Sequence, residues 1–234
     1  GLQMHIGSQL TSVSPFVEAV EKVAPLAADL KNKYGIEFFS IGGGIGIVYE
    51  DALASGSESW WTNQPDETRP LTPEKYSSAI IPSLAPLGLK ILLEPGRFIA
   101  GNAGVLVTKC LYEKKGTTKT FKIVDSGMHH LIRPALYEGF HEIVPVAEPS
   151  GAIESVDVVG PICESGDFFC QNREVSTFAP SELIALMSAG AYGMVMATTY
   201  NSHPLPAEIL VDGNQAKIAR KRQTFQDLVV GEEG

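Results

Sequence analysis

The chain has few cysteines, and their arrangement excludes several classes of protein. Only three are present, Cys110, Cys163 and Cys170, and their spacing is not that of zinc ligands. An odd number of widely separated cysteines is typical of a reducing compartment rather than of a disulfide-stabilised secreted protein. We therefore expect a cytoplasmic protein without a metal site, in which Cys110 and Cys170 are packing residues.

Positive charge and long apolar segments are also scarce. The 18 Lys and Arg residues face 27 Asp and Glu residues, which gives a net charge of −9. An acidic surface repels phosphate groups, so neither nucleic acid nor an anionic membrane is expected as a partner. No apolar run approaches the ~20 residues of a membrane-spanning helix, and no signal-peptide pattern is visible. The remaining composition, 44% hydrophobic and 19% charged, is that of an ordinary globular protein.

The first part of the chain alternates between strand-like and helix-like segments. Apolar residues recur at helical spacing from Phe16 to Tyr34, after a Ser14–Pro15 start and before a stop at Gly35. A second helix is expected over residues 71–87, and short apolar strands over residues 2–6, 36–41 and 90–93. This alternation indicates parallel βα units.

The pattern changes after residue 104, where short β-type runs are separated by Gly, Pro and charged turns. We therefore expect an α/β domain over residues 1–104 and a mostly β domain over residues 105–234. Three βα units cannot close a (β/α)8 barrel. Residues 1–104 are then either the last three units of a barrel on a longer polypeptide or a different fold. The expected strands are Val105–Tyr112, Phe121–Asp125, Ser155–Val159, Leu183–Met187 and Ile209–Val211.

Five short motifs carry most of the polar chemistry. They read HIGSQ at residues 5–9, GGGIG at 42–46, EPGR at 94–97, GPICESGD at 160–167 and GAYG at 190–193. The first three follow expected strands, which is where parallel α/β sheets place their functional groups. Taken singly, the motifs are ambiguous, because a lone His is commonly structural, Gly-rich turns are frequent and a solitary Cys is usually buried.

The motif residues nevertheless suit particular ligands. Glycines at 42–44 would let backbone N–H groups approach an anion closely. Arg97 could pair with Glu94, or it could bind a phosphate or a substrate carboxylate through its planar fork. These alternatives stay open on the residues alone.

In this order the five motifs resemble those of the alanine-racemase-like decarboxylases that depend on pyridoxal 5'-phosphate (PLP), and within them the branch that acts on diaminopimelate. The resemblance extends from Gly1 to about Gln215. It implies that the chain is the C-terminal part of a PLP-binding TIM (β/α)8 barrel followed by a mostly β domain.

The resemblance assigns the cofactor contacts mainly to the first domain. His5, also a catalytic residue by resemblance, would pack against the PLP ring, and Ser8 would reach the phosphate. Glu94 would lie beside the pyridine nitrogen and favour its protonated form. Arg97 would bind the phosphate or the substrate carboxylate. The phosphate would also contact backbone N–H groups of Gly42, Gly43 and Gly44.

The resemblance assigns proton transfer and substrate recognition to the second domain. Cys163, on a loop that enters the neighbouring subunit's site, would return a proton to the carbon that loses CO2. Glu164 would face the ammonium at the far end of the substrate. Arg133 and Tyr137, four residues apart and on one face if helical, would bind the distal carboxylate. Tyr192 would contact the cofactor phosphate or the substrate, or else be a core tyrosine.

The resemblance thus implies decarboxylation of meso-2,6-diaminopimelate to L-lysine and CO2, the last step of lysine biosynthesis, in a homodimer with shared active sites. One alternative is the same chemistry on carboxynorspermidine, ornithine or arginine, which Glu164, Arg133 and Tyr137 disfavour. Another is a non-catalytic binding relative, because the family's PLP lysine lies upstream of HIGSQ. A third is an unrelated α/β protein with coincidental motifs. None of Lys22, Lys31, Lys33, Lys75 and Lys90 stands in the context of that lysine.

The segment Tyr49–Pro70 departs from the family pattern. It is polar, lacks a clear period, is longer than is usual in the family and includes Trp60 and Trp61. Long loops in compact domains are commonly lids or interfaces. We expect an added surface element near the mouth of the active site.

Overall fold

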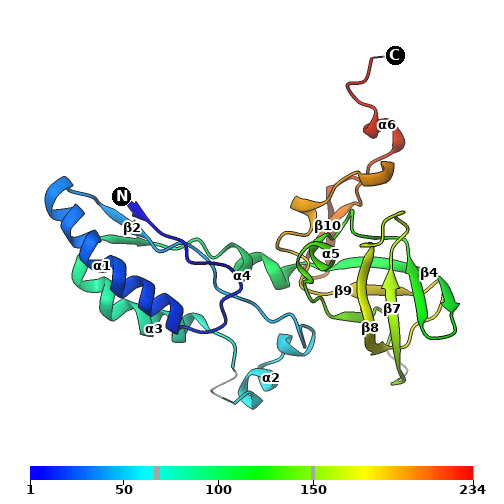
Figure 1. Cartoon of the computed structure of the whole chain (residues 1–234), viewed down its shortest axis with the longest axis horizontal. Helices are drawn as coiled ribbons and strands as arrows, with labels where there is room; N and C mark the ends of the chain where they lie inside the picture. Colours follow the sequence, from blue (N-terminus) through cyan, green and yellow to red (C-terminus); the bar gives the residue numbers. More distant parts are fainter. Residues whose placement is uncertain (66–68, 149–150, 234) are drawn as a thin grey trace. The chain divides into compact units, whose positions relative to one another are not determined.

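The structure is a computed structural model, and it describes residues 1–65, 69–148 and 151–233. The chain divides into two compact units, unit 1 (Gly1–Gly104) and unit 2 (Val105–Gly234), and each is described by itself (Figure 1). Over the described ranges, no helix has both the length and the apolar composition that crossing a membrane would require.

Unit 1 is built on a parallel sheet with the strand order β1-β2-β3. The strands are β1 (Leu2–Gln3), β2 (Phe38–Ser40) and β3 (Lys90–Leu92). Helices α1 (Ser14–Tyr34) and α3 (Pro73–Leu84) follow β1 and β2 in sequence and lie side by side (Figure 1). The parallel α/β arrangement expected from the sequence is therefore present.

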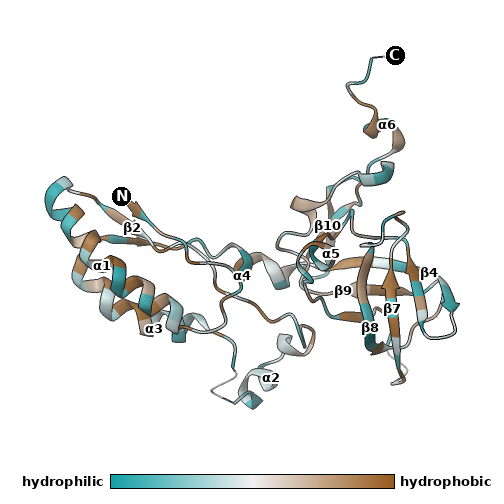
Figure 2. Cartoon of the chain, viewed as in Figure 1, coloured by the Kyte–Doolittle hydropathy of each residue, from teal (hydrophilic) through white to brown (hydrophobic). Residues whose placement is uncertain are grey.

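Helix α1 forms where the sequence predicts it, because its ends carry strong signals. Pro15 occupies the first turn, and Gly35 ends the helix with a φ of 64° while its N–H donates to Lys31 O at 2.9 Å. The buried residues of α1 pack against α3, and Phe16 meets Tyr76 edge to face with ring centroids 5.0 Å apart. Hydrophobic and hydrophilic residues alternate around α1 in Figure 2, as this one-sided burial requires.

The segment Tyr49–Pro70 contains local structure that the sequence pattern did not predict. It forms the 3-10 turn η1 (Ala54–Gly56) and the short helix α2 (Glu58–Asn63). Trp60 and Trp61 meet edge to face, and Trp61 Nε1 donates to Ser55 O at 2.8 Å. Residues 66–68 of this segment lie outside the described residues.

Unit 2 is built on a six-stranded sheet with the order β6-β9-β4-β5-β7-β8. Only β5 and β7 pair in parallel, and the other neighbours are antiparallel. The two end strands, β6 and β8, also approach each other, so the sheet is nearly a barrel. The strands are β4 (Leu106–Lys115), β5 (Thr120–Val124), β6 (Ile143–Pro145), β7 (Ile153–Val159), β8 (Phe168–Ser176) and β9 (Leu183–Leu186).

The remaining elements of both units are short. Strands β10 (Glu208–Asp212) and β11 (Gln215–Arg220) form a separate hairpin. The helices and 3-10 turns are η2 (Ala85–Leu87), α4 (Gly96–Ala100), η3 (Gly101–Ala103), α5 (Arg133–Tyr137), η4 (Met194–Met196), η5 (Tyr200–Ser202) and α6 (Phe225–Leu228).

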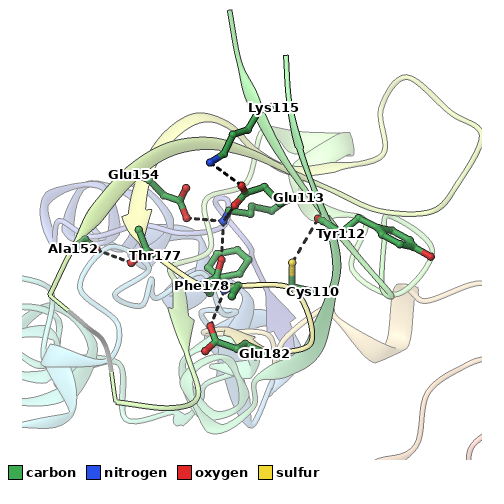
Figure 3. A network of polar contacts seen from close by, with 11 residues as sticks. Cys110, Tyr112, Glu113, Lys115, Ala152, Glu154, Thr177, Phe178 and Glu182 are labelled. Atoms are coloured by element: carbon green, nitrogen blue, oxygen red, sulfur yellow. Dashed lines mark hydrogen bonds and ion pairs between the residues drawn. The ribbon is translucent and has the colours of Figure 1, made fainter. Parts of the chain in front are cut away.

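A buried lysine of β5 pairs with two carboxylates in unit 2. The side chain of Lys122 is 2% exposed, and its Nζ lies 2.8 Å from Glu154 Oε1 and 2.5 Å from Glu113 Oε2. The same ammonium donates to Phe178 O at 2.7 Å. Figure 3 shows the two carboxylates converging, with Lys115 reaching Glu113 from the outside. Although burial lowers the pKa of Lys122, its hydrogen bonds to Glu113 and Glu154 outweigh that effect and raise it overall.

Replacing Lys122 by Ala is expected to destabilise the protein strongly, because two partly buried carboxylates would then lose the buried cation between them. Removing one partner of a buried ion pair costs ~3–5 kcal/mol. Because Glu113 and Glu154 are about a quarter exposed, we expect a loss of about 2 kcal/mol or more in the free energy of unfolding, measured in urea. The control Lys115→Ala removes an exposed partner of Glu113 and should cost below ~1 kcal/mol. Equal losses in both variants would contradict this interpretation.

Candidate active site

In unit 1 the three motifs meet at one edge of the parallel sheet. HIGSQ follows β1, GGGIG follows β2 and EPGR follows β3, so all three lie at the carboxyl ends of adjacent strands. Backbone hydrogen bonds join the three loops, from Met4 N to Ser40 O at 3.0 Å and from Glu94 N to Gly42 O at 2.9 Å. The structure therefore brings together the residues of unit 1 that the resemblance assigned to the cofactor, whereas Tyr192 belongs to unit 2.

The glycine run lies against backbone on both sides. A Cβ on Gly42 would lie 2.4 Å from Met4 O, and one on Gly43 would lie 2.2 Å from Glu94 O. Gly42 also has a φ of 75°, in the left-handed region. Only glycine therefore allows the three loops to approach so closely.

Two amides of the glycine run are directed at side chains. Gly42 N donates to Ser40 Oγ at 3.3 Å, and Gly43 N donates to His5 Nδ1 at 3.4 Å. The second bond orients the imidazole of His5, which is exposed. Both bonds are long, so a stronger acceptor such as a phosphate could compete for these N–H groups.

Glu94 and Arg97 have different partners. The ion pairs found in the described residues do not include one between Glu94 and Arg97. Glu94 Oε1 accepts a hydrogen bond from Ser40 Oγ at 2.5 Å. Arg97 donates from Nη2 to Ser8 Oγ at 3.0 Å and from Nη1 to the hydroxyl of Tyr49, whose ring it also approaches. Ser8 and Arg97 thus present a hydroxyl and a guanidinium at one point, a donor set that suits a phosphate.

In unit 2 the GPICESGD motif forms the loop of the β7–β8 hairpin. Its last residue, Asp167, is 5% exposed and accepts hydrogen bonds from Ile162 N at 2.6 Å and from Met128 N at 2.7 Å. Burial raises the pKa of Asp167, and these two backbone bonds offset part of that rise. The carboxylate therefore fastens the loop to the turn around Met128.

The tip of this loop carries Cys163 and Glu164, which are both exposed, whereas Cys110 and Cys170 are buried. Glu164 Oε2 accepts a hydrogen bond from the hydroxyl of Tyr200 at 3.4 Å. A thiol and a carboxylate are therefore adjacent in sequence at the surface of unit 2, on a loop whose base is anchored by Asp167.

Arg133 and Tyr137 lie four residues apart on a helix, as the sequence suggested, but their side chains differ in exposure. Helix α5 has only five residues, with Arg133 7% exposed at its start and Tyr137 63% exposed at its end. Arg133 Nη1 donates to His141 Nε2 at 2.8 Å, and His141 Nδ1 therefore carries the proton that it donates to Met187 O. The guanidinium is directed inward, although it has further N–H donors.

Tyr192 lies in a strained position of the GAYG turn. Its φ is 61°, and its side chain is 41% exposed. A non-glycine residue is uncommon in the left-handed region, and the surrounding structure must maintain its backbone conformation there. The exposure excludes the core-tyrosine alternative.

A cavity of about 680 Å³ lies beside Glu164 in unit 2. Besides Glu164, it is lined by Met128, His129, Ile132 and the segment Thr198–Ser202. His129 is 1% exposed, and neither of its ring nitrogens has a hydrogen-bond partner within the described part of the chain. Burial, reinforced by the nearby rings of His130 and His203, lowers the pKa of His129 to about 3, so the imidazole is neutral at pH 7.

Sequence reasoning missed several residues of these sites. Ser40, Tyr49 and Tyr200 contact Glu94, Arg97 and Glu164 across separations of 36 residues or more, which no local pattern reveals. Asp167 belonged to a recognised motif, but its anchoring role depends on Met128, far away in sequence.

Known proteins give independent information. The family model described as pyridoxal-dependent decarboxylase, C-terminal sheet domain, matches residues 18–190. This chain belongs to that family. Curated diaminopimelate decarboxylases from Zymomonas mobilis and Aquifex aeolicus are each 40% identical to it, over 100% and 98% of the chain.

Solved structures of this family resemble the chain as well. The crystal structure of diaminopimelate decarboxylase from Helicobacter pylori complexed with L-lysine has a TM-score of 0.83 at 38% identity, over 97% of this chain and 53% of that one. The enzyme from M. jannaschii in co-complex with L-lysine has a TM-score of 0.86 at 31% identity, over 99% and 51%. The chain spans about half the length of the curated relatives that it matches, 52% and 51% of the two named above.

The neutral, buried state of His129 predicts a pH dependence of stability. The pKa of His129 in the folded protein lies below the ordinary value of 6.5, so the unfolded chain takes up this proton first as the pH falls. The free energy of unfolding is therefore unaffected by His129 protonation above pH 6.5 and decreases as the pH falls toward about 3. In that window His129 should add a slope of up to ~1.4 kcal/mol per pH unit to the free energy of unfolding.

Urea titrations at several pH values would measure this slope. His129→Asn should flatten the pH dependence of the free energy of unfolding. An unaltered slope in His129→Asn would show that this ring is charged or solvated in the folded protein.

Proposed function

We propose that the chain is the C-terminal part of a PLP-dependent decarboxylase that converts meso-2,6-diaminopimelate to L-lysine and CO2. The observation that carries the proposal is the β7–β8 loop, which presents a thiol and a carboxylate side by side on a fixed base. The thiol suits proton delivery, and the carboxylate suits an ammonium group. The names of the relatives and the bound L-lysine in two related structures support the choice of substrate.

Unit 1 is proposed to be the last three βα units of a PLP-binding barrel. Its parallel three-stranded sheet, with polar loops at the carboxyl ends, agrees with the way barrels place their sites. The remaining units, and the lysine that holds PLP, would lie on the part of the polypeptide that corresponds to the other half of the relatives.

The residues of unit 1 fit the chemistry of PLP. Ser8 and Arg97 would bind the phosphate, and His5 would pack against the ring. Glu94, oriented by Ser40, would hold a proton on the ring nitrogen. When bound, PLP supplies an electron sink for the negative charge that remains as CO2 departs.

The residues of unit 2 would recognise the substrate and complete the reaction. Glu164 would bind the distal ammonium, and Arg133, steadied by His141, would contribute to the distal carboxylate together with Tyr137. Cys163 would deliver a proton to the carbon that has lost CO2. Tyr192 would contact the phosphate or the substrate. The biosynthetic reaction and the three free cysteines support a cytoplasmic location.

A substrate panel tests the proposed specificity. The complete gene product that carries this chain, saturated with PLP, is expected to decarboxylate meso-diaminopimelate with a kcat/KM at least ~100-fold above those for ornithine, arginine and carboxynorspermidine. A site that pairs with a charged group rejects analogues lacking it by such factors. Release of CO2 and chromatographic identification of the product amine would be measured. A higher kcat/KM for any of the other three would overturn the assignment.

A homodimer with shared sites predicts complementation between two inactive variants. Arg97→Ala removes a cofactor contact of unit 1, and Cys163→Ala removes the proton donor of unit 2, so each homodimer should lose activity at least ~100-fold. In a hybrid dimer, one of the two sites would contain both mutations and the other neither. Hybrids isolated through two different affinity tags should therefore regain about half of the wild-type activity. Inactive hybrids would mean that each site is built within one subunit.

A further inference from the structure

The side chain of Glu164 accepts a hydrogen bond from Tyr200. The hydroxyl of Tyr200 lies 3.4 Å from Glu164 Oε2, and 36 residues separate the two in sequence. Both side chains are exposed, and both line the cavity of about 680 Å³. A carboxylate accepts and a phenol donates, so the direction of this hydrogen bond is fixed.

Both residues are fastened to the same short turn, which gives their contact a fixed geometry. The loop of Glu164 is tied to this turn by the bond from Met128 N to Asp167 Oδ1 at 2.7 Å. The segment of Tyr200 is tied to it by the bond from Thr198 N to His129 O at 2.8 Å. A further bond joins His130 Nε2 to Pro204 O at 3.1 Å, on the other side of Tyr200.

The backbone around Tyr200 is also held in an uncommon conformation. Asn201 and Ser202 have φ values of 55° and 60°, in the left-handed region. Two successive non-glycine residues of this kind persist only where the surroundings determine them. The segment therefore presents Tyr200 toward the cavity at a conformational cost.

We propose that Tyr200 is a positioning residue for Glu164, and that it thereby contributes to recognition of a cationic group at the far end of the substrate. The inference rests on the proposed function. The phenol restricts the rotamers of an otherwise exposed carboxylate and occupies Oε2. Oε1 is then directed at the ligand, so less ordering of the side chain is needed on binding. The ligand class is a primary ammonium, since the cavity wall also includes the neutral ring of His129 and the hydroxyl-bearing residues Thr198, Thr199 and Ser202.

The test compares Tyr200→Phe, Glu164→Gln and the double variant in the complete gene product, with two substrates. One is meso-diaminopimelate, and the other is 2-aminopimelate, which lacks the distal ammonium. Tyr200→Phe should raise the KM for meso-diaminopimelate by about 3- to 10-fold, with kcat changed less than about twofold. The KM for 2-aminopimelate should not change. In the Glu164→Gln background, Tyr200→Phe should have no further effect.

Tyr112→Phe is the matched control, because this tyrosine of β4 is 68% exposed and its hydroxyl is in none of the hydrogen bonds found in the described residues. Its kinetics should equal those of the wild type. An unchanged KM in Tyr200→Phe would overturn the proposal. So would an equal effect on both substrates or an equal effect in the Glu164→Gln background, because each would indicate a general structural role.

These outcomes are separable from failure of the proposed function. If the wild-type enzyme instead prefers ornithine, arginine or carboxynorspermidine, the substrate assignment fails. The same comparison is then made with that substrate, which also carries a cationic far end. A wild-type enzyme that decarboxylates none of the four would overturn both proposals.

Discussion

One buried carboxylate, Asp167, determines how unit 2 presents its functional residues. It accepts backbone N–H groups from its own loop and from Met128. The space around it is so restricted that a Cβ on Gly127 or on Gly160 would lie 2.5 Å from a carboxylate oxygen. Loop and turn are thereby joined at one point. The energetic cost is visible in the raised pKa of Asp167, since burial disfavours its charged form more than the two bonds restore it.

The consequences of this anchor extend through three further segments. The turn held by Asp167 continues into His129 and His130, and these fix the Thr198–Pro204 stretch. It then enters α5, where Arg133 is held by His141. The thiol, the acidic side chain and the guanidinium are therefore positioned by a common core of buried polar contacts.

Unit 1 positions its candidate functional residues in a different way. Its strands are only two or three residues long, and close backbone approach at the glycines brings the three loops together. The residues suited to a phosphate and a ring nitrogen gather there, whereas those suited to proton delivery and to a distal ammonium belong to unit 2. Under the proposed function, motifs from both units would therefore contribute to one reaction.

Much of the fold could be predicted from the sequence, and the reasons are local. Helix α1 has end signals and regular burial, and β4, β5, β7, β9 and β10 are apolar runs bounded by turns. Strand β8 was missed because its middle is polar and Asn172 adopts a φ of 47° beside a register shift. Strand β6 has only three residues, too few for a period. The site motifs were visible, but the inward direction of Arg133 depends on His141, and the role of Tyr200 depends on Glu164. Such pairings arise from tertiary structure and leave no trace in residue spacing.

The measurement that tests the account most directly is a crystal structure of the complete gene product with PLP and L-lysine bound. The central claim is that the β7–β8 loop recognises the amino group at the far end of the ligand. CO2 leaves from the reacting end of the substrate, so the distal amino group becomes the α-ammonium of L-lysine. The claim predicts that this α-ammonium lies about 3 Å from a carboxylate oxygen of Glu164, with the hydroxyl of Tyr200 on the other oxygen. An ammonium bound elsewhere, with Glu164 directed into solvent, would contradict the claim.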